Sequence, residues 1–291
     1  MIYPVIMSNN RLQPIIKEIV WQKKIEVAQI QQEMSFASLQ RQLTAAPTVR
    51  DFFTAIQQNI YQPGLIAEVK KLLSHQDIVT SNFDFDPLAI AKSYVVGGAT
   101  CLSVMTDQKF FQGGFDHLRI IRHRIAVPLL CKDFIIDPCQ IYLARAAGAD
   151  AVLLIAAILT DAEINNLLRV INYLGMNAVI EVHNLTELDR VLKLEDVRII
   201  AINNRSLEDF SVNLSITQQL MAARRSQLQN LGILVISESG IETPADISLM
   251  ADAGIHAVLM SDVLLKQQNL EVAVKNLLNH KFSVSKNMIK K

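Results

Sequence analysis

Short apolar runs and amphipathic stretches alternate along most of this chain, from Leu65 onward. The apolar runs have the length of strands, and most are rich in Val, Ile and Leu without alternating polar positions. This pattern is typical of parallel strands that are buried on both faces. The predicted strands are Leu65–Val69, Thr100–Val104, Val127–Cys131, Ala151–Ile155, Ala178–Val182, Ile199–Ile202, Ile233–Ile236 and Ala257–Met260.

The stretches between these runs predict helices, and several are followed by a glycine that would end the helix in a left-handed conformation. Eight strands that alternate with helices indicate an α/β fold of the (β/α)8 TIM barrel type. A doubly wound open sheet is the alternative, although no glycine-rich fingerprint follows the first run. The predicted helices include Asp137–Ala147, Ala162–Leu174, Leu185–Leu192, Leu214–Arg225 and Pro244–Ala253, and the glycines are Gly97, Gly148, Gly175 and Gly254.

The first 60 residues follow a different pattern. Leu12–Met34 has apolar residues at helical spacing, and Thr48–Asp51 would begin a short helix that ends near Gln58. We expect residues 1–60 to form a helical extension packed on the barrel, residues 61–280 the barrel and residues 281–291 a basic tail, all within a single domain. Trp21 is expected to anchor the first helix against the barrel.

Composition limits the classes of partner. The 51% hydrophobic and 19% charged residues exclude a disordered chain, and the 28 basic residues equal the 28 acidic ones without a basic cluster. We therefore expect no nucleic-acid partner. Ala151–Leu159 is too short to cross a bilayer and the start does not resemble a signal peptide, so we expect no membrane partner. The cysteines Cys101, Cys131 and Cys139 are interpreted as small buried hydrophobes of a cytoplasmic protein.

Polar side chains follow the predicted strands, where the active sites of such barrels lie. Buried charges are costly unless they are paired or functional, so this convergence favours a catalytic mouth over a set of structural ion pairs. A lysine among glutamates can act as a general acid toward a carbonyl oxygen, and a second lysine can hold a carboxylate. No metal-ligand set or redox motif is visible, and no cofactor is expected. The residues at the mouth are Glu68, Lys70, Lys132, Glu181, Asn203, Arg205, Glu238, Ser239 and Asp262, with His183 beside them as a histidine held in one tautomer.

Six segments of the chain carry recognisable motifs: Ile66–Lys71, Lys132–Ile136, Ala149–Leu154, Glu181–His183, Ile202–Arg205 and Ser237–Ile241. Together they resemble the indole-3-glycerol phosphate synthase family. The similarity extends from about Leu12 to about Leu278 and includes the N-terminal helices. It implies a (β/α)8 barrel that closes the pyrrole ring of indole by cyclisation, decarboxylation and dehydration, without a cofactor.

The resemblance also implies roles for individual residues. Lys132 would be the general acid of ring closure, and Lys70 would bind the substrate carboxylate. Glu181 and Glu68 would move protons. Substrate-binding positions that match the family are Asn203, Glu238, Ser239, Gly240 and Arg205, and the aromatic pocket would be lined by Phe111 and Phe134.

The positions that hold the substrate phosphate in the family are altered in this chain. Leu73 stands where the family has a serine that contacts phosphate, and Ser261-Asp262 replaces a glycine followed by a small or acidic residue. Glycine lets a backbone approach phosphate closely, whereas serine restricts that approach. The acid–base half of the site is retained while the phosphate half, apart from Gly240, is not.

This division predicts a change of substrate. The expected substrate is a small, aromatic, carboxylated molecule: a non-phosphorylated indolic β-keto acid made by coupling indole-3-pyruvate with 4-hydroxyphenylpyruvate. A diverged member of the family, the scytonemin-biosynthesis cyclase, is similar in this respect. Two alternatives remain: a genuine indole-3-glycerol phosphate synthase of tryptophan biosynthesis with a variant phosphate loop, and a catalytically silent barrel that binds an indole compound. A homodimer is compatible with each of them.

Overall fold

The eight predicted strands form one closed barrel. The computed structural model describes residues 13–71 and 85–278. All neighbouring strands are parallel and follow the chain order, and β1 pairs with β8, so the sheet has no open edge. The (β/α)8 prediction is thus confirmed and the open sheet is excluded. The strands are β1 (Gly64–Val69), β2 (Cys101–Met105), β3 (Leu129–Lys132), β4 (Ala151–Ile155), β5 (Asn177–Val182), β6 (Ile199–Asn203), β7 (Leu234–Glu238) and β8 (Ala257–Met260).

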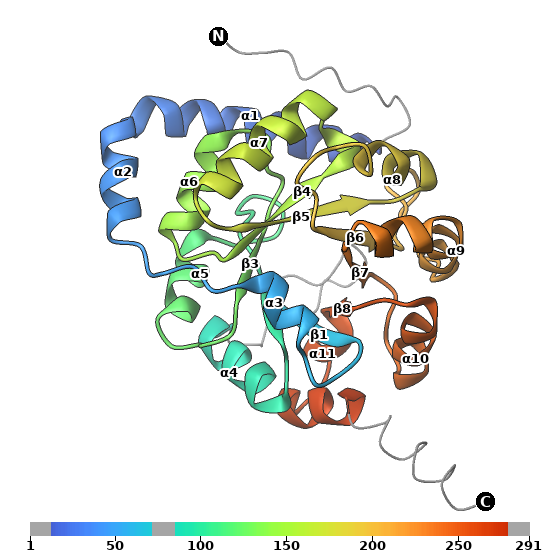
Figure 1. The fold of residues 1–291 in the computed structure, drawn as a ribbon. Helices are drawn as coiled ribbons and strands as arrows, with labels where there is room; N and C mark the ends of the chain where they lie inside the picture. The colour runs from blue at the N-terminus through green and yellow to red at the C-terminus, as the bar shows by residue number, and fades with distance from the viewer. Residues whose placement is uncertain (1–12, 72–84, 279–291) are drawn as a thin grey trace, which may run out of the picture.

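Helices surround the barrel and cover the outer faces of its strands (Figure 1). The predicted helix from Leu214 continues five residues beyond Arg225, and α2 had no counterpart among the predictions. The labelled helices are α1 (Pro14–Glu33), α2 (Phe36–Thr44), α3 (Phe52–Gln57), α4 (Pro87–Gly97), α5 (Phe115–Arg122), α6 (Pro138–Ala146), α7 (Asp161–Tyr173), α8 (Leu185–Val191), α9 (Ser215–Asn230), α10 (Pro244–Ala253) and α11 (Asp262–Leu265), with a 3-10 turn at Ala156–Ile158. Residues 270–278 are also helical.

The N-terminal helices contact the barrel at two places. Helices α1 and α2, drawn in blue in Figure 1, pack against α6 on the outside of the barrel. Helix α3 contacts β2 and β7, and the backbone N–H of Phe53 donates to Asn177 at the start of β5 (3.2 Å). This places α3 over the end of the barrel where the strands begin. The opposite end, where the strands finish, carries the polar residues predicted from the sequence.

Trp21 does not anchor α1, because its side chain is 65% exposed. The face of α1 that packs inward carries Ile16, Ile19, Val20 and Lys23. Two residues along a helix are about 200° apart, so Trp21 points away from the side that Ile19 and Lys23 occupy. The anchoring prediction was wrong in its residue, and the charged Lys23 is buried in its place.

Glycine ends three of the predicted helices as expected, with φ of 96° at Gly148, 71° at Gly175 and 88° at Gly254. Gly97 is different, because it is the last residue of α4 and the left-handed residue that follows the helix is Gly98, with φ of 111°. A Cβ at Gly97 would lie 2.6 Å from Cβ of Val274. Close packing therefore accounts for the first glycine of the pair, and helix termination for the second.

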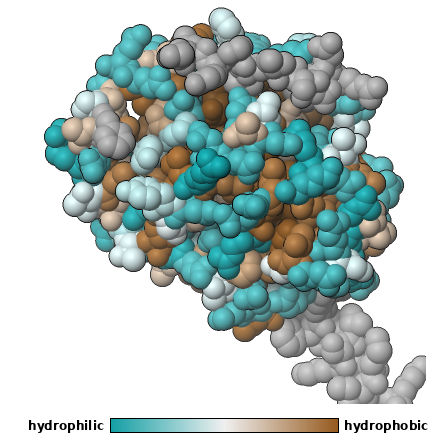
Figure 2. All heavy atoms as spheres, turned by 45° about the horizontal axis from the view of Figure 1, so that its top comes forward, coloured by the Kyte–Doolittle hydropathy of each residue, from teal (hydrophilic) through white to brown (hydrophobic). Residues whose placement is uncertain are grey.

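Hydrophobic side chains are largely enclosed. Figure 2 shows one face of the molecule, where hydrophilic residues surround smaller groups of hydrophobic ones. The three cysteines are buried and unpaired, in agreement with their interpretation as small hydrophobes. Within residues 13–71 and 85–278, no helix is both long enough and apolar enough to span a membrane.

Candidate active site

Lys132 ends β3 with its ammonium group between two glutamates from other strands. Its Nζ lies 3.0 Å from both carboxylate oxygens of Glu238 and 3.2 Å from Oε2 of Glu181. Burial lowers the pKa of Lys132, but the charges of Glu238 and Glu181 outweigh it and the net shift is upward. The side chain therefore keeps its proton, and its 14% exposure leaves it open to the mouth. A protonated lysine in this position can donate to an oxygen of a bound molecule.

The two glutamates around Lys132 have opposite pKa shifts. Burial raises the pKa of Glu181, but the charges of Lys132 and His183 carry it well below its usual range. Burial also raises the pKa of Glu238, and the neighbouring charge of Glu181 adds to that increase despite the opposing effect of Lys132. Carboxylates whose pKa values are separated in this way can serve as a base and an acid in one site. Asn203 orients the ionised member, since its Nδ2 donates to Oε1 of Glu181 (3.2 Å).

His183 contacts a carboxylate through each ring nitrogen. Its Nε2 lies 3.0 Å from Oε1 of Glu181, and its Nδ1 lies 3.1 Å from Oε2 of Glu187. Burial lowers the pKa of His183, but these two partners raise it to about 10. Both contacts favour the doubly protonated ring, whereas the sequence predicted a histidine held in one tautomer. Glu187 lies on α8, and its contact with the ring depends on how that helix packs against β5.

The two charged residues of β1 form an ion-pair chain with α11. Nζ of Lys70 lies 2.5 Å from Oδ1 of Asp262 and 3.6 Å from Oε1 of Glu68. Ser261 precedes α11, and its hydroxyl contacts the same oxygen of Asp262 (3.4 Å). An acidic group thus neutralises Lys70 at this edge of the mouth. Leu73, the other altered position, lies outside the described residues.

The chain turns sharply after β7. Ser239 and Gly240 both have left-handed backbones, with φ of 69° and 77°. Asn204 supports this turn, because its Nδ2 donates to the carbonyl of Ser239 (3.1 Å). A Cβ at Gly240 would lie 2.3 Å from Cγ1 of Val212, so glycine is required there. Arg205 donates from Nη1 to the carbonyl of Phe210 (3.3 Å), which ties it to the loop after β6.

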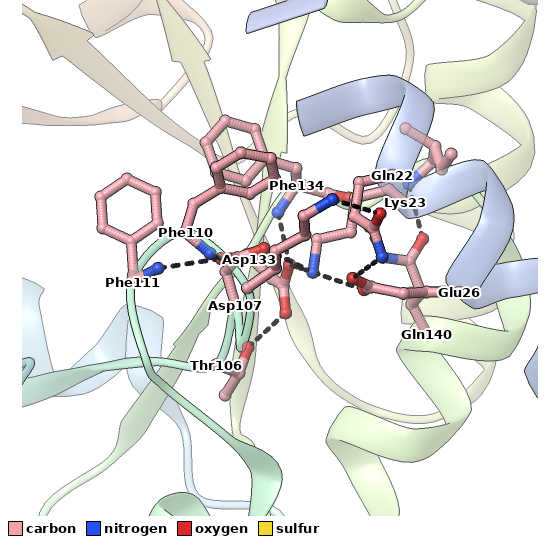
Figure 3. Close-up of polar contacts among 12 residues, drawn as sticks. Gln22, Lys23, Glu26, Thr106, Asp107, Phe110, Phe111, Asp133, Phe134 and Gln140 are labelled. Carbon is pink, nitrogen blue, oxygen red and sulfur yellow. Dashed lines mark hydrogen bonds and ion pairs between the residues drawn. The ribbon is translucent and has the colours of Figure 1, made fainter. Parts of the chain in front are cut away.

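Phe111 and Phe134 lie together on the loops after β2 and β3. Their rings are stacked, with centroids 6.1 Å apart and an angle of 25° between the planes. Each backbone N–H donates to an aspartate, Phe111 to Asp107 (3.1 Å) and Phe134 to Asp133 (2.8 Å), as Figure 3 shows. Both rings are half-buried, which suits them to contact a planar molecule at the mouth.

Sequence reasoning left three buried residues of this region without a role: Lys23, Asp107 and Asp133. Asp133 directly follows β3 and Asp107 lies two residues after β2, so their place at the mouth could have been read from the strand ends. Lys23 gave no such signal, because a lysine within an amphipathic helix is normally solvated. Only its 2% exposure in the folded chain distinguishes it.

Comparison with known proteins agrees with the sequence resemblance. The sequence model of one family, described as indole-3-glycerol phosphate synthase, matches residues 16–277. A curated protein with that name from Rippkaea orientalis is 50% identical over 275 residues, which cover 94% of this chain and 93% of the relative. Its counterpart from Crocosphaera subtropica is 48% identical with the same coverage. The chloroplastic enzyme of Arabidopsis thaliana is 44% identical over 274 residues, covering 92% of this chain and 68% of the relative.

Proposed function

Because the chain belongs to the indole-3-glycerol phosphate synthase family, we propose that it is a carboxy-lyase that closes the pyrrole ring of indole in tryptophan biosynthesis. The observation that carries this proposal is the ammonium of Lys132, held between Glu181 and Glu238 at the barrel mouth. About half of the aligned residues are identical to those of enzymes with that name, which favours the phosphorylated, anthranilate-derived substrate over a diverged one.

The site suits the steps of this reaction. The ring carbon that bears the carboxylate attacks the substrate's keto carbon, and Lys132 gives its proton to the keto oxygen. The bond to the carboxylate then breaks, CO2 leaves, and its electron pair restores the aromatic ring. Glu238, whose pKa is raised, gives a proton to the new hydroxyl, which departs as water, and the second glutamate removes a proton from the neighbouring carbon. Glu181, the more acidic of the two glutamates beside Lys132, is the proposed base.

The test is turnover of the phosphorylated anthranilate substrate, followed by indole fluorescence and by CO2 release. We expect turnover by the wild type at micromolar substrate, and a loss of about 10²–10⁴-fold for Lys132→Met, the range ascribed to a positioned general acid. Circular dichroism establishes that the variant is folded. Equal rates for wild type and variant would reject Lys132 as the acid, and an inactive wild type would reject this substrate.

The ion pair between Lys70 and Asp262 favours a second candidate function. Ser261 stands where the family has a glycine that lets the backbone approach phosphate, and at the same edge of the mouth the carboxylate of Asp262 lies 2.5 Å from Nζ of Lys70. Each charge-assisted hydrogen bond lost there would weaken phosphate binding by about 1.5–3 kcal/mol. The candidate is the same chemistry on a non-phosphorylated indolic β-keto acid, derived from indole-3-pyruvate and 4-hydroxyphenylpyruvate, as in scytonemin biosynthesis.

Parallel kinetics separate the two candidates. The enzyme is assayed with each substrate, and the one with the higher kcat/KM is assigned. In the phosphorylated case, Asp262→Asn should lower KM, because a repulsive charge is removed. In the phosphate-free case, the β-keto acid should be turned over with the higher kcat/KM. If the wild type and Lys132→Met release CO2 equally slowly from both substrates, the chain is instead a catalytically silent barrel that binds an indole compound.

A further inference from the structure

A buried lysine of the N-terminal extension contacts the loops of the barrel mouth. Nζ of Lys23, on α1, lies 2.8 Å from Oδ2 of Asp107, 2.8 Å from Oδ1 of Asp133 and 2.9 Å from Oε2 of Glu26 (Figure 3). The two aspartates come from the loops after β2 and β3, more than 80 positions along the chain from α1. One ammonium group therefore links three segments.

Asp107 organises the loop that carries Phe111. Its Oδ1 accepts the backbone N–H groups of Phe110 (2.7 Å) and Phe111 (3.1 Å), while its other oxygen faces Lys23. The loop is tight, because the N–H of Gly113 donates to the carbonyl of Asp107 (2.7 Å). The side chain of Asp107 is fully buried, so its orientation sets the position of the Phe111 backbone.

Asp133 has the same function in the next loop, directly after Lys132. Its Oδ1 accepts from the N–H of Phe134 (2.8 Å), and its Oδ2 accepts from the hydroxyl of Thr106 (2.6 Å). The N–H of Thr106 in turn donates to the carbonyl of Lys132 (3.0 Å). The end of β3 and the Phe134 ring thus depend on one aspartate.

Removal of Lys23 would leave two buried carboxylates facing each other. Both now contact the same nitrogen atom, and without it their charges would repel and drive the two loops apart. Burial lowers the pKa of Lys23, but Asp133 and Asp107 raise it further than burial lowers it, so the lysine stays charged. The other contacts of α1 with the mouth are more exposed, such as the bond from Nζ of Lys109 to Gln22 (2.8 Å).

We propose that Lys23 is a positioning residue of the ring-closing reaction, which holds the stacked Phe111–Phe134 pair and the Lys132 strand end in place through Asp107 and Asp133. This inference rests on the proposed decarboxylative cyclase activity. It gives the N-terminal extension a part in substrate binding in addition to its packing. A displacement of about 1 Å in a positioned group can cost on the order of 10²-fold in rate.

The test compares Lys23→Met with Lys24→Met. Lys24 is the next residue of the same helix, is half-buried, and makes no ion pair with any residue in the described ranges 13–71 and 85–278. We expect Lys23→Met to raise KM and to lower kcat/KM by about 10²-fold, and Lys24→Met to stay within about twofold of the wild type. Lys23→Arg, which keeps the charge, should recover part of the loss. Rates are normalised to folded protein, measured by circular dichroism.

Asp107→Asn tests the same link without removing the lysine. Its amide oxygen can still accept from Phe110 and Phe111, while the amide nitrogen no longer pairs with Lys23. It should raise KM in the same direction as Lys23→Met, and it serves as the decisive variant if Lys23→Met does not fold.

If both variants keep the KM and the kcat of the wild type per folded protein, Lys23 is purely structural and the inference is overturned. A wild type that is inactive on both candidate substrates would instead overturn the proposed function. The two failures are therefore distinguishable.

Discussion

At the scale of single residues, this protein buries charged groups and compensates each with opposite charges. Lys132 has two glutamates, Lys23 has two buried aspartates, and His183 has one carboxylate at each nitrogen. A buried charge is tolerated only while its partners remain in place. The effect of such partners on stability can be measured at His183, because its pKa differs from that of the lysines.

The pKa of His183 rises from 6.5 to about 10 on folding, so the charged ring stabilises the folded state fully below pH 6.5 and loses this effect as pH rises through 10. We therefore expect the free energy of unfolding to fall across this interval, and to fall less in His183→Gln. Chemical denaturation at a series of pH values measures it. His256→Gln is the control: the pKa of His256 is lowered by burial, so it should leave the slope above pH 6.5 unchanged. Parallel slopes for wild type and His183→Gln would contradict the assignment.

At the scale of elements, local hydrogen bonds determine where helices begin. Helix α7 has a reciprocal cap, in which the N–H of Glu163 donates to Oγ1 of Thr160 (3.3 Å) and the N–H of Thr160 donates to Oε2 of Glu163 (2.7 Å). This arrangement satisfies donors that a helix leaves unpaired at its start. Because α7 packs on β5, the cap also bears on the strand that carries Glu181.

Thr160→Ala should lower the free energy of unfolding by about 1 kcal/mol, because the substitution removes Oγ1 and the backbone N–H of Glu163 loses its acceptor. Ser248→Ala is the matched control. The hydroxyl of Ser248 donates to the carbonyl of Pro244 within α10 (3.1 Å), a bond that adds little to helix stability. Urea denaturation of both variants gives the comparison, and equal losses would show that the cap has no specific effect.

At the scale of the whole molecule, Asp150 joins the N-terminal extension to the barrel. This fully buried aspartate precedes β4 and accepts from the backbone N–H groups of Arg50 (2.7 Å) and Leu129 (2.8 Å). Nη1 of Arg122, on α5, lies 2.8 and 2.7 Å from its two oxygens, and Nη2 of Arg122 donates to the carbonyl of Thr48. The extension, α5 and two strands therefore meet at one buried ion pair.

Arg122→Met should lower the free energy of unfolding by about 3–5 kcal/mol, because it leaves the charge of Asp150 buried without its partner. Arg119→Met, on the same helix, should cost less than about 1 kcal/mol, because the pair between Arg119 and Asp116 is exposed to solvent. Denaturant titration of both variants measures the difference. A small effect for Arg122→Met would mean that the backbone donors alone satisfy Asp150.

The fold and most of the mouth could be predicted from the sequence, because both depend on local patterns. Buried parallel strands appear as continuous apolar runs, and the residue that ends each run lies at the same end of the barrel. Lys132, Glu181 and Glu238 each lie at such a strand end, and all three meet at the mouth. The family could be identified in the same way, because its motifs are short segments around the strand ends.

The sequence by itself thus determined the barrel, its strand order and the chemical groups at its mouth. Only the tertiary structure decided which of these groups pair: Lys70 with Asp262, His183 with Glu187, and Lys23 rather than Trp21 against the barrel. A step of one or two residues on a helix turns a side chain from the barrel to solvent, and most of the partners are far apart along the chain. Periodicity shows which residues face inward, whereas their partners are set by how separate elements pack together.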